Sequence, residues 1–94
     1  MELKILNSAL EATISFLRNS QSSDWAGMSV EELILELESE IESIKNSQSA
    51  DAKRIGFLFA PTGPIQEISI DNGWGDEFLR VSEIVDQCTA PHSR

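Results

Sequence analysis

The stretch IGFLFAPTGPIQEISI, residues 55–70, decides which fold the sequence predicts. Its first six residues form a short, aromatic run that is apolar on both faces, which is typical of a buried strand. Residues 61–64, with two prolines and a glycine, predict a turn, because Pro fixes φ and Gly permits a positive φ. Residues 65–70 are more polar and indicate a strand nearer a sheet edge. We therefore expect strands over residues 54–60 and 65–70 that pair as an antiparallel β-hairpin.

On both sides of this hairpin the apolar residues follow the 3.6-residue period of an α-helix. This period predicts helices over residues 2–19, 30–45 and 76–88, followed by a tail over residues 89–94. The apolar arc of the first helix is wider than one neighbour requires, so we expect this helix to contact two neighbours or to lie at the centre. Ser29 and Glu32 form a capping box at the start of the second helix.

The predicted fold class is therefore α+β: one small domain over residues 1–94, in the order α-α-β-β-α, with the hairpin packed against three helices. A two-stranded hairpin is marginally stable alone, so the helices must cover it or another chain must extend it. Open strand edges also predict self-association as a homodimer, either by edge-to-edge pairing or by packing of exposed apolar helix surface. The residues expected in the core are Leu6, Leu10, Leu17, Leu37, Ile41, Phe57, Phe59, Phe78 and Val81.

Composition excludes several classes of function. The chain has 94 residues with 7 basic and 16 acidic side chains, a formal net charge of −9, which argues against a nucleic-acid surface. No apolar run approaches the ~18 residues of a membrane span. Glu2 lies where a secretory signal would carry positive charge, so we expect a cytoplasmic protein. One cysteine permits no internal disulfide, and no Cys/His cluster predicts zinc.

No residue is predicted to be catalytic, and no metal or cofactor is expected. His92, the one histidine, lies in the proline-flanked tail, where a catalytic base would have no fixed position. Cys88 lies on an apolar stripe near a helix C-terminus, which does not stabilise a thiolate. The stretch from Asp71 to Glu77 has oxygen ligands but not the spacing of an EF-hand.

The strongest functional feature is the acidic face of the second predicted helix. Its glutamates repel one another at i,i+4 spacing, whereas a face that only confers solubility more often mixes signs. A solvated face and a site for a basic partner are about equally consistent with this pattern, and the apolar Leu35 on that face favours a partner. Trp74, beside two glycines, is a further candidate anchor at a partly exposed surface. The predicted partner-binding residues are Glu31, Leu35, Glu38, Glu42 and Trp74.

Two segments resemble a small bacterial protein family without established activity. They are LFAPTGPIQE, residues 58–67, and NGWGDEFL, residues 72–79; Trp25 and the stretch SVEE, residues 29–32, are also similar. The resemblance implies a bacterial cytoplasmic origin and assigns no catalytic residue.

The sequence as a whole predicts a non-enzymatic interaction module, such as an inhibitor or immunity-type protein for a basic partner. This analogy rests on size and charge. Two alternatives stay open. One is a small-ligand-binding or carboxylate-based enzyme domain, and the other is a structural homo-oligomer. The residues of the enzyme alternative are Glu67, Asp71, Asp76 and Glu77.

Overall fold

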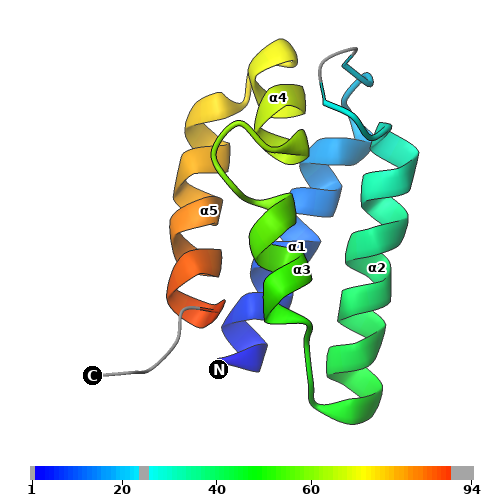
Figure 1. The fold of residues 1–94 in the computed structure, drawn as a ribbon, viewed down its shortest axis with the longest axis vertical. Coiled ribbons are helices and arrows are strands. Elements are labelled where there is room, and N and C mark those ends of the chain that lie inside the picture. Colours follow the sequence, from blue (N-terminus) through cyan, green and yellow to red (C-terminus); the bar gives the residue numbers. More distant parts are fainter. Residues whose placement is uncertain (1, 24–25, 90–94) are drawn as a thin grey trace.

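The computed structural model describes residues 2–23 and 26–89, and these residues form helices joined by turns and loops (Figure 1). The expected β-hairpin is wrong, since the described part of the chain contains no strand, and the fold is all-helical rather than α+β. Trp25 and the tail from residue 90 onward, including His92, lie outside the description. The helices are α1 (Leu3–Arg18), α2 (Val30–Ser47), α3 (Ala52–Leu58), α4 (Pro64–Asp71) and α5 (Gly75–Thr89).

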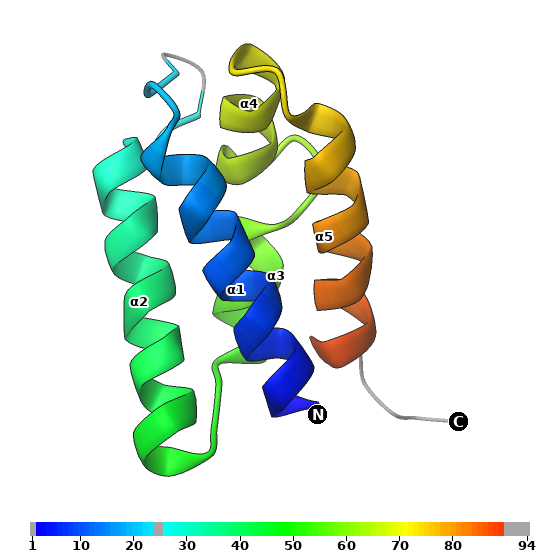
Figure 2. The same ribbon diagram turned by 180° about the vertical axis from the view of Figure 1, so that it is seen from behind.

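Helix α1 lies between α2 and α5, as Figure 2 shows most clearly, and it packs against both. The expectation that the first helix has two neighbours is confirmed. Helices α3 and α4 pack against α5, and α3 lies over the side of the molecule that faces the viewer in Figure 1. None of the helices in the described residues combines the length and the apolar composition that a bilayer crossing requires.

The first predicted strand, residues 54–60, is largely occupied by α3. Ile55, Leu58 and Phe59 are buried at the i, i+3, i+4 spacing of a helix. Phe57, which a strand would place on the same face as Phe59, is 54% exposed. The helix begins at Ala52, and Asp51 is its N-cap, whose side chain accepts a hydrogen bond from the Arg54 backbone N–H at 3.0 Å. Placing Phe57 in the core is therefore wrong.

The second predicted strand, residues 65–70, belongs to α4. Ile65 and Ile68 are buried, whereas Ile70 is 59% exposed. Pro64 is the first residue of the helix, where its missing N–H is not needed. Gly63 precedes it in close contact with the preceding turn, since an added Cβ would lie 2.9 Å from the Ala60 carbonyl oxygen. The glycine–proline pair therefore begins a helix instead of turning a hairpin.

The residues from Asp71 to Gly73 form the C-terminal end of α4. Gly73 has a φ of 83°, and its N–H donates to the Ile70 carbonyl at 3.4 Å. The Trp74 N–H donates to the Ser69 carbonyl at 2.9 Å. These two bonds are those of a Schellman motif, in which a left-handed residue reverses the chain after a helix. The motif leads directly from α4 into α5.

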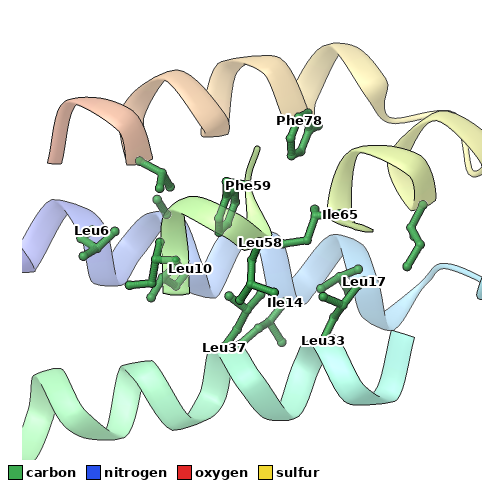
Figure 3. Packing of buried hydrophobic residues seen from close by; sticks show 14 of the residues in the cluster. Leu6, Leu10, Ile14, Leu17, Leu33, Leu37, Leu58, Phe59, Ile65 and Phe78 are labelled. Carbon is green, nitrogen blue, oxygen red and sulfur yellow. The ribbon is translucent and has the colours of Figure 1, made fainter. Parts of the chain in front are cut away.

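The core lies where α1 meets the other helices (Figure 3). The rings of Phe59 and Phe78 stack there, with centroids 6.2 Å apart and an interplanar angle of 7°. Ile41 and Val81, expected in the core, are only partly buried against it. The other expected core residues, apart from the exposed Phe57, are buried: Leu6, Leu10, Leu17, Leu37, Phe59 and Phe78.

Candidate functional site

The outward surface of α2 brings together four of the five predicted partner-binding residues. At 100° per residue, Glu31, Leu35, Glu38 and Glu42 fall within an arc of about 60°, and all four are exposed. Leu35 is 66% exposed, which is the largest exposed fraction of any large apolar residue in the described part of the chain. We call these four residues the acidic face.

The other glutamates of α2 hold the fold together. Glu32 completes the predicted capping box: its Oε1 accepts from the Ser29 N–H at 2.9 Å, while Ser29 Oγ accepts from the Glu32 N–H at 3.1 Å. Glu40 Oε1 accepts from the Asp51 N–H at 3.0 Å, at the start of α3. These contacts and the ion pair of Glu36 described next tie α2 to its own cap and to α3.

Glu36 forms an ion pair with Arg54 of α3, with 2.8 Å between Glu36 Oε1 and Arg54 Nε. This hydrogen bond raises the pKa of the Arg54 guanidinium above its ordinary value. The guanidinium also lies 5.4 Å from the centroid of the Phe57 ring, within the range of a cation–π contact. The sequence pattern alone did not separate Glu36 from the outward glutamates.

Within the acidic face, one carboxylate is paired and two are not. Glu38 Oε2 lies 3.0 Å from Arg18 Nη2 of α1, and both side chains are exposed, so the pair contributes little stability. Glu31 and Glu42 have no ion pair or side-chain hydrogen bond with any other described residue. Their charges are therefore available to a partner.

A groove runs beside the acidic face, between α1 and α2. It consists of two adjoining hollows of about 780 and 360 Å³ that share Glu11 and Ile41. We call the two together the α1–α2 groove. Glu42 belongs to the first hollow and Glu38 to the second, so the groove is continuous with the acidic face. The lining residues are Leu3, Lys4, Asn7, Ser8, Glu11, Ile14, Arg18, Glu38, Ile41, Glu42, Ile44, Lys45 and Gln48.

Trp74 lies in the core rather than at the surface where it was expected. Only 6% of the residue is exposed. Its ring stacks on Phe16 of α1, with centroids 4.8 Å apart, and its indole Nε1 donates to Ser20 Oγ at 2.8 Å. It therefore takes no part in the surface formed by α2.

Asn72, two residues before Trp74, ties the same corner to the chain after α1. Its side-chain Oδ1 accepts from the Gln21 N–H at 2.9 Å, and its Nδ2 donates to the Gln21 carbonyl at 2.9 Å. The NGWG stretch therefore joins the corner between α4 and α5 to the end of α1. Its role in the described structure is to hold the fold together.

The carboxylates of the enzyme alternative are spread over the ends of two helices. Glu67 lies in the first turn of α4, and Asp76 and Glu77 lie in the first turn of α5, where acids favour the helix dipole. Asp71 is the last residue of α4. None of the four lines the α1–α2 groove. Within residues 2–23 and 26–89, no group of three or more His, Cys, Asp or Glu side chains is placed to hold a metal ion.

Cys88 also has the environment of a structural residue. It is buried at the inner side of α5, and this burial raises the pKa of the thiol above its ordinary value. A raised pKa disfavours the thiolate, which is the nucleophilic form.

Comparison of the chain with protein-family models, curated proteins and solved structures found no match in any of the three. The resemblance to a small bacterial family stays a prediction.

Proposed function

We propose that the protein is a non-enzymatic interaction module whose acidic face binds a basic protein. The observation that carries this proposal is Leu35, a large apolar side chain that is 66% exposed in the middle of an acidic surface. An apolar contact inside a charged rim is the usual arrangement of a protein interface. The rim charges would speed association with a basic surface, and the leucine would slow dissociation.

The different contacts made by the glutamates of α2 support this proposal. Glu36 and Glu40 meet α3, and Glu32 caps its own helix. Glu42 has no such contact, and Glu31 has only the favourable position of an acid in the first turn of α2, although their like charges lie on one helix surface. An inhibitor or immunity-type protein acting in the cytoplasm on a basic partner is the specific form of the proposal.

Photo-crosslinking tests the proposed surface. A photoreactive phenylalanine analogue replaces Leu35 in one variant and Leu79, which is 57% exposed on α5, in the control. Irradiation in the cells that produce the protein should give an adduct from position 35 and not from position 79. The captured protein should have more Lys and Arg than Asp and Glu. Equal adducts at both positions, an acidic captured protein, or no adduct at position 35 would overturn the proposal.

A structural homo-oligomer is the second candidate, and the exposed apolar side chains of α3, α4 and α5 favour it. Phe57, Ile70 and Leu79 are each more than half exposed. Pairing through strand edges has no basis in the described all-helical structure, so a dimer would have to pack helices. Sedimentation at high micromolar concentration decides: a species of 10.4 kDa excludes this candidate, and twice that mass supports it.

A further inference from the structure

We infer that the basic partner places an amphipathic α-helix in the α1–α2 groove, with the C-terminal turn of that helix at Lys4 and Lys45. This inference rests on the proposed function and specifies which element of the partner binds and in which direction.

The shape of the groove favours a helix. A helix packs against two others by placing its side-chain ridge in the groove between them. The opposite side of α2 is already occupied by α3, through Glu36 and Glu40. The two hollows lie on the side of α2 that adjoins α1, and Figure 2 shows these two helices side by side. Helix α1 has 16 residues, which corresponds to about 24 Å or four helical turns of a partner.

The middle of the groove complements a basic residue with apolar neighbours. Ile41 is partly buried and lines both hollows, as does Glu11 of α1, and Glu42 of α2 lines the first hollow with them. Among the described residues, neither of these two carboxylates has an ion pair. A Lys or Arg that reaches these carboxylates, on a helix whose apolar side chains meet Ile41, would satisfy both groups.

The ends of the groove differ in charge, and this difference sets the direction of the bound helix. Lys4 and Lys45 line the same hollow and have no ion pair within the described residues. At the other end, Arg18 is already paired with Glu38 at 3.0 Å. A helix carries partial negative charge at its C-terminus. The C-terminal turn therefore belongs at the two lysines, and the bound helix runs antiparallel to α1 and parallel to α2.

Two synthetic peptides test the direction. Both are 16-residue helices with leucines at three- and four-residue spacing and lysines beside them, and a hydrocarbon staple opposite the leucines keeps both helical. One carries two glutamates in its last turn, and the other carries them in its first turn. Binding is followed by amide chemical shifts of the labelled protein. The peptide with C-terminal glutamates should bind about fivefold more tightly, as expected for two exposed ion pairs.

Three variants of the protein serve as controls. Replacing Lys4 and Lys45 together by Glu should reverse the preference between the peptides. Ser8→Trp should weaken both peptides, because Ser8 lines the groove. Ala12→Trp, at an exposed α1 position that lines neither hollow, should weaken neither. Thermal unfolding of each variant checks that the fold is retained.

The shifts should centre on Ser8, Glu11, Ile41 and Lys45. Equal affinities, shifts centred on Phe57 or Leu79, or no binding at millimolar peptide would each overturn the inference. Its failure is distinguishable from failure of the proposed function. If the peptide with C-terminal glutamates binds more tightly but position 35 gives no adduct, the proposed basic partner is contradicted and directional helix binding in the groove is supported. If position 35 gives an adduct but the two peptides bind equally, the proposed function is supported and the direction of the bound helix is contradicted.

Discussion

Trp74, at the corner Asn72–Trp74, and the outward surface of α2 were both predicted from the sequence to bind a partner. In the structure, Trp74 at the corner is buried, and the outward surface of α2 is exposed. The corner contains a rare tryptophan between glycines, yet that indole is buried on Phe16 and bonded to Ser20. The α2 surface contains ordinary glutamates, yet it exposes Leu35 and leaves Glu31 and Glu42 without an ion pair among the described residues. The rare residue, Trp74, is therefore part of the folded core, whereas the common glutamates of α2 belong to the candidate interface.

The sharpest test of this contrast compares Trp74→Ala with Leu35→Ala. Removing the buried indole should lower the free energy of unfolding by about 3–5 kcal/mol, since large core truncations leave cavities. Removing the exposed leucine should change it by less than about 0.5 kcal/mol. Urea unfolding measures both. Similar midpoints for the two variants would mean that the corner is not part of the core.

The next prediction concerns the segment whose secondary structure the sequence pattern misidentified. Phe59→Ala should cost about 3–5 kcal/mol, because Phe59 is 1% exposed and stacks on Phe78. Phe57→Ala should cost less than about 1 kcal/mol, since Phe57 is more than half exposed and its ring contacts Arg54. Equal losses in the free energy of unfolding, measured by chemical denaturation, would mean that both rings face the core, as they would in a strand.

The third prediction addresses the acidic face itself. Replacing Glu38 and Glu42 together by Lys should slow association with the crosslinked partner about tenfold at low ionic strength, and added salt should reduce the difference. Stopped-flow mixing measures the rate, and circular dichroism should show unchanged helix content.

Ser29→Ala is the control for that experiment. It removes the N-cap bond of α2 and should lower stability by about 1 kcal/mol without changing the association rate. If the double charge reversal also leaves the rate unchanged, the acidic face is only a solvated surface.

The smallest expected effect separates the two sides of α2. Glu36→Gln breaks a partly exposed ion pair with Arg54 and should lower the unfolding temperature slightly, because exposed ion pairs contribute little stability. Glu42→Gln should be neutral or slightly stabilising, because it relieves repulsion from Glu38 at i,i+4. Thermal unfolding at low salt resolves the difference. A larger loss from Glu42→Gln would show that the outward carboxylate has a structural partner.

Local signals in the sequence mark the ends of α3 and α4, but residues 54–70 were interpreted as a hairpin. Asp51 is an N-cap, Gly63-Pro64 begins a helix, and Gly73 ends one. A short apolar run does not by itself distinguish a strand from a buried helix. In α1, α2 and α5 the apolar period continues over at least 15 residues, which is long enough for the helical period to be unambiguous.

The candidate site divides in the same manner. Exposure of Glu31, Leu35, Glu38 and Glu42 follows from the helical period of α2, so the sequence predicted where they lie. The α1–α2 groove was missed, because it depends on how two helices pack rather than on either helix. The burial of Trp74 was missed because its hydrogen-bond partner Ser20 is 54 residues earlier in the chain.

By itself the sequence determined what depends on near neighbours: the three long helices, the Ser29 capping box and the charge on the outward side of α2. These features rest on contacts between residues three or four apart. Only the tertiary structure decided which glutamate meets Arg54, which aromatic rings are buried and where a groove stays open. Each of these depends on how helices that are separate in the sequence pack against one another. Burial and pairing across helices are properties of the packed fold, and the local period does not encode them.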